Sequence, residues 1–289
     1  VAETSENTVV TEYEPVKKRS DSYQSEVALE QEFIRLLCEQ GYEYLPIHTE
    51  KDLIANLRKK LEELNNYQFS DTEWDDFFKN AVANPNEHIV EKTRKIQEDN
   101  VQVLTRDDGS SKNITLIDKK NIHNNRLQVI NQYKVNAATG IREGSLGCVI
   151  GTENGAKHDN RYDVTILVNG LPLVHIELKR RGVAIREAFN QINRYQRDSF
   201  WAGCGLYEYI QIFVISNGTN TKYYSNSTRR NAEKEHEKRG ASKTKTSNSF
   251  EFTCFWADAN NRVIPDLIDF TKTFFAKHTI LTILTKYCI

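Results

Sequence analysis

Cysteine is scarce in this sequence and shows no paired spacing. Five cysteines are spread over 289 residues, and no two of them form a C-x-x-C pair. A small, odd and scattered set is typical of reduced thiols in a cytoplasmic protein. It disfavours both a disulfide framework and a structural zinc site.

Long hydrophobic runs are absent as well. No stretch approaches 18 consecutive apolar residues, so we expect no membrane span. The first 20 residues also lack the apolar run with basic flanks that marks a secretory signal. We therefore expect a cytoplasmic localisation and no membrane partner.

An excess of positive charge is the third absence. The chain has 39 basic against 40 acidic residues, a formal net charge of −1. Dedicated nucleic-acid binders are usually far more basic, so any contact with DNA would depend on a local patch. The hydrophobic fraction of 38%, with 10% aromatic residues, is nevertheless sufficient for a packed core.

Helical periodicity follows a polar, flexible tail predicted for residues 1–20. One predicted helix starts at Ser25 and ends near Gly41, and a second lies within 53–64. Ser70 and Glu73 have the spacing of a capping box and predict a third helix. A fourth is expected over 86–97.

Strand-like alternation replaces the helical period after residue 100. A further helix interrupts these strands at 184–198, and the pattern predicts an α/β or α+β fold with a mostly antiparallel sheet and helices on its faces. Two segments, 136–160 and the charged 228–249, are predicted loops, and we expect the second to be disordered. The predicted strands are 101–104, 114–117, 127–133, 162–168, 173–178, 210–216, 222–225 and 250–255.

The segment from Arg161 to Lys179 predicts a hairpin with its turn at Asn169-Gly170. A two-residue turn, the default for Asn-Gly, pairs residues whose numbers sum to 339 and mixes polar with apolar side chains on both faces. A three-residue loop gives a sum of 340 and one wholly apolar face. Burial should select this second register, which places Asp163 across from Glu177.

Two carboxylates converging beside an ammonium suit phosphodiester hydrolysis. Oxygen ligands from Asp163 and Glu177 would hold a divalent cation, and Lys179 would orient the attacking water or offset developing charge. His175 falls on the same face and is a candidate water or metal ligand, although a lone histidine is more often a neutral spectator. The alternative for the whole group is a solvated cross-strand charge cluster.

The helix that follows carries a second set of candidates. Ala184, Ala188, Gln191 and Tyr195 share one stripe at helical spacing, which would place the last two near the carboxylates. Basic residues surround them and could contact phosphates, although such a helix face is often merely solvated. These residues are Lys179, Arg180, Arg181, Arg186, Arg194 and Arg197.

The order Asp163, Glu177-Leu178-Lys179 and Gln191-x-x-x-Tyr195 resembles the D…ExK…QxxxY pattern of RecB-like PD-(D/E)xK nucleases. The surrounding text, including DSYQSEVALEQEFIRLLCEQGYEYL, EKTRKI and FVISNGTNTKYYSN, is similar to the N-terminal part of type I restriction endonuclease (R) subunits. The resemblance covers roughly residues 20–289. It implies a restriction-endonuclease-like core, a mixed central sheet flanked by helices with an N-terminal helical region. The nuclease domain would span 21–260, and 261–289 would be a helical linker toward a motor domain.

The resemblance also implies site roles and partners. Asp163 and Glu177 match the metal-binding acids, Lys179 the catalytic lysine, and Glu30 an accessory acid. The implied cofactor is Mg²⁺, for which Mn²⁺ can substitute. The implied partners are duplex DNA, the modification and specificity subunits, and a C-terminal ATP-driven motor.

No P-loop is present in this chain, because GTENGAK at 151–157 and the SNGTNTK segment do not fit GxxxxGK[ST]. We therefore expect ATP to act only in the full-length subunit. Two other functions remain open at this stage: a RecB-like nuclease of repair or recombination, and a non-catalytic docking module.

Overall fold

The computed structural model describes residues 2–3, 9–10, 24–135, 159–226 and 248–287. Of the predicted tail, only β1 (Ala2–Glu3) and β2 (Val9–Val10), a pair of two-residue antiparallel strands, are described. The predicted loop at 136–160 and the predicted disordered loop at 228–249 lie almost wholly outside the described residues. No helix in the described ranges combines the length and apolar character needed to cross a membrane.

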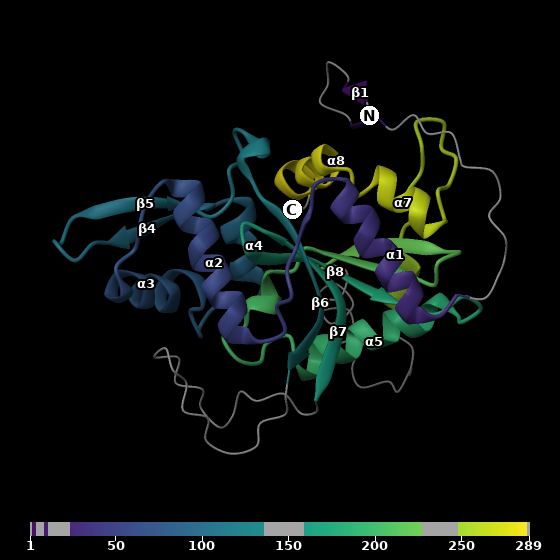
Figure 1. Ribbon diagram of the computed structural model, residues 1–289, viewed down its shortest axis with the longest axis horizontal. Coiled ribbons are helices and arrows are strands. Elements are labelled where there is room, and N and C mark those ends of the chain that lie inside the picture. Colours follow the sequence, from purple (N-terminus) through teal and green to yellow (C-terminus); the bar gives the residue numbers. More distant parts are fainter. Residues whose placement is uncertain (1, 4–8, 11–23, 136–158, 227–247, 288–289) are drawn as a thin grey trace.

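A six-stranded mixed sheet forms the centre of the molecule (Figure 1), and this confirms the predicted α/β class. Its order is β10-β9-β8-β7-β6-β3, and the β8–β9 and β3–β6 pairs are parallel while the other three are antiparallel. The sheet is therefore more mixed than the predicted, mostly antiparallel one. The strands are β3 (Glu43–Tyr44), β6 (Leu127–Val135), β7 (Asn160–Val168), β8 (Leu171–Leu178), β9 (Ile212–Ser216) and β10 (Thr221–Ser225).

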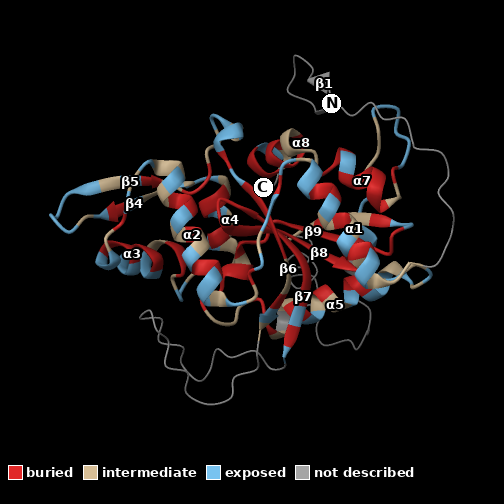
Figure 2. Cartoon of the chain, viewed as in Figure 1, coloured by how far each residue is buried: buried red, intermediate tan, exposed pale blue. Residues whose placement is uncertain are grey.

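Strand β8 is buried along its whole length (Figure 2). Elements packed on both faces of a strand exclude water from it, and such strands are rich in aliphatic residues rather than strictly alternating. The charged and polar residues on β8 are therefore removed from water. This burial dominates the electrostatics of the candidate site.

Two helices begin with the caps that the sequence predicts. Ser25 accepts a hydrogen bond from the backbone N–H of Ala28 at the start of α1, and Ser70 and Glu73 form the predicted capping box of α3. The fourth helix starts at Ile89, three residues later than predicted, with His88 as its N-cap. The helices are α1 (Glu26–Glu39), α2 (Glu50–Asn65), α3 (Asp71–Phe77), α4 (Ile89–Gln97) and α5 (Ile185–Asp198).

Two predicted strands form a separate hairpin instead of joining the central sheet. β4 (Val101–Thr105) and β5 (Ser111–Thr115) pair only with each other, and Figure 1 shows them projecting beside α2 and α3. The predicted strand at 250–255 is wrong. That segment forms a 3-10 helix over Asn248–Phe252, followed by a single bridge between Tyr223 and Cys254.

The C-terminal apolar segment folds as α7 (Leu267–Thr273), α8 (Lys277–Thr282) and a π-helical turn (Ile283–Tyr287). Phe270, Phe274 and Phe275 are fully buried, and the hydroxyl of Tyr42 donates to the carbonyl of Phe275. α7 packs on α1, as Figure 1 also shows. Residues 264–284 thus contribute to the same hydrophobic core as the sheet, and the proposed division at residue 260 stays a prediction.

Candidate nuclease site

The hairpin of β7 and β8 sets the register of the candidate site. Val164 pairs with Ile176, Thr165 with His175 and Ile166 with Val174, all with the predicted sum of 340. Asp163 is therefore the next residue beyond the last ladder pair, across from Glu177.

The predicted three-residue loop is wrong, however. Leu167 pairs with Pro172 and Val168 with Leu171, so the turn is the two-residue Asn169-Gly170, with φ of 51° and 85°. These angles belong to the tight turn that Asn-Gly favours. A β-bulge then shifts the pairing by one residue and leaves Leu173 without a paired residue on β7. The bulge lies between the turn and the site. The hairpin therefore has the two-residue turn that Asn-Gly favours and also the apolar pairing near the site.

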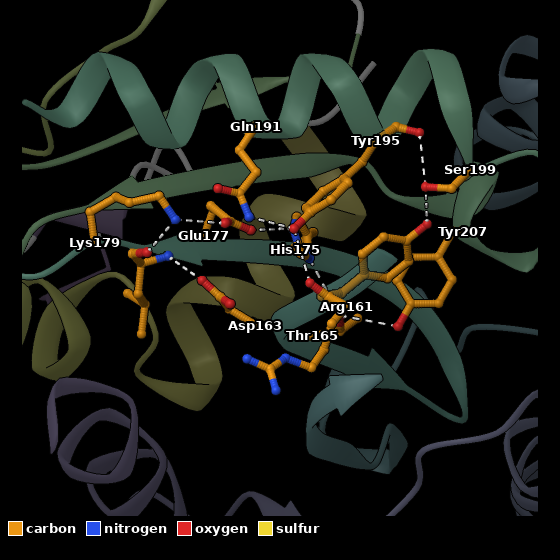
Figure 3. Close-up of polar contacts among 12 residues, drawn as sticks. Arg161, Asp163, Thr165, His175, Glu177, Lys179, Gln191, Tyr195, Ser199 and Tyr207 are labelled. Carbon is orange, nitrogen blue, oxygen red and sulfur yellow. Dashed lines mark hydrogen bonds and ion pairs between the residues drawn. The ribbon is translucent and has the colours of Figure 1, made fainter. Parts of the chain in front are cut away.

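Asp163 lies where the β7–β8 ladder ends. Its Oδ2 accepts a hydrogen bond from the backbone N–H of Leu178 at 2.9 Å (Figure 3). The side chain thus satisfies a backbone donor of β8 that does not bond to β7. The carboxyl is buried, and burial together with the negative charge of Glu177 holds its pKa well above the usual range. A nearby cation would reverse this penalty.

Glu177 and Lys179 form the centre of the site (Figure 3). Lys179 Nζ lies 3.0 Å from Glu177 Oε1, and it also donates to the carbonyl of Leu178 at 2.9 Å. Glu177 is fully buried, which raises its pKa to about 7 although Lys179 opposes the shift. Burial acts to lower the pKa of Lys179, but the carboxylates of Glu177 and Asp163 outweigh it, so this pKa is raised.

His175 is buried beside Glu177 and is neutral at physiological pH. Burial lowers its pKa to about 4, against the opposing charge of Asp163. Its Nε2 lies 3.5 Å from Glu177 Oε2, and neither atom has a hydrogen-bond partner among the residues that the structure describes. Since the imidazole is neutral, this contact is not an ion pair. The ring packs edge-on against Tyr162 and Tyr195.

Gln191 and Tyr195 are brought together by one helical turn of α5. Gln191 Nε2 donates to the hydroxyl of Tyr195 at 2.5 Å, and this hydroxyl donates to the carbonyl of Arg161 at 2.9 Å (Figure 3). The pair therefore ties α5 to β7 two residues before Asp163. Their catalytic contribution stays a prediction.

The predicted basic residues lie in different surroundings. Arg180 is exposed, whereas Arg181 is half-buried and its Nε donates to Gln24 Oε1 at 3.3 Å. The guanidinium of Arg186 stacks over Phe250 at 4.7 Å, and that of Arg194 lies over Tyr195 at 5.4 Å. The side chain of Arg197 lies outside the described residues. Contact of these residues with DNA stays a prediction.

Glu30 on α1 contacts the sheet through hydrogen bonds from two side-chain amides of β6. Its Oε1 accepts from Asn131 Nδ2 at 2.7 Å and its Oε2 from Gln132 Nε2. These bonds do not test its predicted role as an accessory acid, which stays a prediction.

Two neighbours of the site were not predicted from the sequence. Glu26 lies 3.9 Å from Lys179 Nζ, and Gln132 lies across the sheet from Asp163. Neither residue belongs to a recognisable sequence motif of the site, because only the tertiary structure brings α1 and β6 next to it.

The donor set fits the magnesium ion that the resemblance implies. Mg²⁺ usually binds one or two protein carboxylates and keeps several waters. Asp163 and Glu177 supply two, and Glu177 Oε2 is a buried oxygen without a hydrogen-bond partner. Among the residues that the structure describes, no group of three or more His, Cys, Asp or Glu side chains could hold a metal. The two carboxylates are thus a partial ligand set that water and phosphate oxygens would complete.

The raised pKa of Glu177 predicts a pH-dependent stability effect. The folded chain binds this proton more tightly than the unfolded chain, so its stability decreases as pH rises from about 4.5 to about 7. Glu177→Gln removes the ionisable group. In EDTA, we expect it to raise the free energy of unfolding at pH 8 relative to the parent by on the order of 3 kcal/mol. At pH 5 the gain should be much smaller.

Thermal or urea unfolding at the two pH values measures this difference. Asp163 also loses the repulsion of Glu177 in the variant, and this acts in the same direction at pH 8. The same substitution at exposed Glu251 is the matched control. An equal gain at pH 5 and pH 8 would contradict the assigned ionisation of Glu177.

Comparison with known proteins now identifies the family. The family model described as the type I restriction enzyme R protein N terminus matches residues 23–232. The chain is 46% identical over 290 residues to the type I restriction enzyme EcoprrI endonuclease subunit of Escherichia coli, covering all of this chain and 82% of that protein. It is 35% identical over 272 residues to the SsaAORF53P endonuclease subunit of Staphylococcus saprophyticus and 33% identical over 273 residues to the SauMSSORF170P subunit of Staphylococcus aureus.

The alignment with these two staphylococcal subunits spans only about a quarter of their length, 24% and 25%, but more than nine tenths of this chain. The resemblance to the N-terminal part of type I restriction endonuclease (R) subunits, inferred from the stretches around the D…ExK…QxxxY residues, is confirmed. This chain belongs to the family formed by the N-terminal region of type I restriction enzyme R proteins, the endonuclease subunits of these enzymes.

Proposed function

We propose that this chain is the magnesium-dependent nuclease region of a type I restriction complex and hydrolyses phosphodiester bonds of duplex DNA. One observation carries the proposal. The fully buried carboxylate of Glu177 has an unpartnered oxygen and lies across from Asp163 and beside Lys179. Burying two acids so close together is costly unless a cation or a proton compensates their charge.

Each of the three residues has a distinct part in this reaction. Asp163 and Glu177 bind the cation, which, when bound, polarises the phosphate and lowers the pKa of a coordinated water. Lys179 keeps its positive charge because the carboxylates raise its pKa. It is therefore suited to orient the attacking water and to stabilise the negative charge that develops on the phosphate.

The substrate and partners follow from the relatives and from the charge of the chain. With a net charge of −1, the chain has no general attraction for DNA. The exposed Arg180, Arg186 and Arg194 would contact phosphates locally. We expect recognition to depend on the modification and specificity subunits, and DNA delivery to depend on ATP-driven motor domains of the same subunit. The family match favours this assembly over a RecB-like repair nuclease.

Metal binding tests the proposal directly and separates it from a docking module. Asp163→Asn keeps an oxygen that can accept from Leu178 but removes the negative charge. We expect it to weaken Mn²⁺ binding at least about tenfold, because a charged oxygen ligand is lost. Titration followed by calorimetry or by electron paramagnetic resonance of Mn²⁺ measures the affinity.

Asp75→Asn is the matched control, since this carboxylate is exposed on α3 away from the site. Its Mn²⁺ affinity should equal that of the parent. Parental affinity in Asp163→Asn would exclude the proposed metal site and favour a non-catalytic charge cluster.

A further inference from the structure

Gln132 has an unusual backbone conformation beside the candidate site. Asn131 pairs with Val164 and Tyr133 with Tyr162, so Gln132 lies across from Asp163 between these two pairs. Its φ is +54°, in the left-handed region, although it lies within β6. This conformation is unfavourable for any residue other than glycine. The surrounding structure must therefore compensate this cost.

The carboxylate of Glu30 holds Gln132 in place. The side-chain amides of Asn131 and Gln132 both donate to it, one to each oxygen. Successive side chains of a regular strand point to opposite faces and could not reach one carboxylate in this way. The positive φ of Gln132 breaks the alternation and makes the double contact possible. Glu30 is buried, so it is a fixed anchor rather than a mobile surface acid.

The remaining amide oxygen is left without a partner. Gln132 Oε1 is buried and has no hydrogen bond within the described part of the chain, which is an unfavourable state for an acceptor. Glu177 Oε2 is unpartnered as well. The two unsatisfied oxygens thus belong to the two residues that lie across from Asp163, Gln132 on β6 and Glu177 on β8.

We propose that Gln132 is a positioning residue of the metal site, whose amide oxygen accepts a hydrogen bond from a water on the divalent cation that Asp163 and Glu177 hold. This inference rests on the proposed function. Glu30 acts through Gln132, because it fixes the amide nitrogen and thereby directs the oxygen. The left-handed backbone and the unsatisfied acceptor then have one common explanation: both serve to orient a water bound to the cation.

Gln132→Gly separates the side chain from the backbone. Glycine adopts a positive φ without strain, and this gain opposes the loss of the donor to Glu30, so we expect a urea unfolding midpoint close to that of the parent. Loss of the amide oxygen should weaken Mn²⁺ binding about tenfold, as for other residues that orient a metal's ligands. Asn66→Gly is the matched control. Asn66 also has a positive φ of 46°, but it is an exposed residue at the end of α2.

Gln132→Glu gives the opposite combination. It keeps an acceptor oxygen but can no longer donate to Glu30, and it places two carboxylates together. We expect a loss of stability without metal at pH 8, together with a Mn²⁺ affinity at least as high as that of the parent. A purely structural role for Gln132 predicts instead that metal affinity decreases only as stability decreases.

The Asp163→Asn variant distinguishes the possible failures. If it weakens Mn²⁺ binding while Gln132→Gly binds like the parent, the role of Gln132 is overturned and the proposed function stands. If the parent chain binds no Mn²⁺, or Asp163→Asn has no effect, both proposals are overturned. A tenfold loss in Asn66→Gly would also overturn the role of Gln132, since the effect would then belong to any glycine substitution.

Discussion

Lys179→Ala is expected to abolish DNA cleavage while metal binding persists. The substitution removes a positive charge 3.0 Å from Glu177 Oε1, so the carboxylate becomes a freer ligand and Mn²⁺ affinity should be kept or raised. The charge that we propose to stabilise the transition state is lost at the same time. Such a loss typically lowers the rate about 100- to 1,000-fold. Cleavage is measured with the full-length subunit assembled with its partner subunits, DNA and ATP.

The matched control for this experiment is Lys59→Ala, an exposed lysine on α2 away from the site. It should cleave like the parent. ATP hydrolysis by the assembly should be unaffected in both variants, because the proposed motor lies outside this chain. Normal cleavage by Lys179→Ala would place the catalytic lysine, and with it the active site, elsewhere.

Gly170→Ala is expected to destabilise the whole domain. Gly170 has a φ of +85°, and a Cβ added there would lie 2.6 Å from the Cα of Leu57. The clash is with the backbone of α2, which no side-chain rotation can relieve. Together with the cost of the left-handed conformation, we expect a loss of about 3 kcal/mol or more in the free energy of unfolding. Urea denaturation in EDTA measures this loss without a contribution from bound metal.

Gly109→Ala separates the two contributions to this loss. Gly109 has a similar φ of +79°, but a Cβ added there would have no neighbour within 4 Å, so only the backbone cost of about 1–2 kcal/mol applies. If Gly170→Ala costs no more than Gly109→Ala, then the close packing of the hairpin turn on α2 is not important for stability.

The hairpin shows how far local rules reach. The preference of Asn-Gly for a two-residue turn and the demand for an apolar face conflict in the sequence, since each predicts a different register. The apolar pairing correctly predicts the site end, where Val164 faces Ile176. It misses the turn, because a bulge between Ile166 and Leu167 accommodates both preferences. A bulge leaves no signature in the period-two pattern of so short a strand.

Tertiary context also decided the fate of the C-terminal and peripheral segments. The alternation in 250–255 predicts a strand, but this segment has only a single bridge to β10 and forms a 3-10 helix instead. Residues 101–115 do form strands, yet they pair away from the central sheet. Short strand patterns contain no information on which partner they will find.

The sequence by itself predicted the candidate site residues and the α/β class, and it determined the helix starts at Ser25 and Ser70. The helix starts depend on residues a few positions apart, where capping and periodicity act directly. Only the tertiary structure decided that Glu177 is fully buried with a pKa of about 7, that Glu26 lies near Lys179, and that Glu30 holds Gln132 across from Asp163. Burial and cross-strand neighbours depend on the pairing of β6, β7 and β8 with α1. The hydrogen bonds from β6 to Glu30 of α1 join residues 101 and 102 positions apart, and no local pattern specifies them.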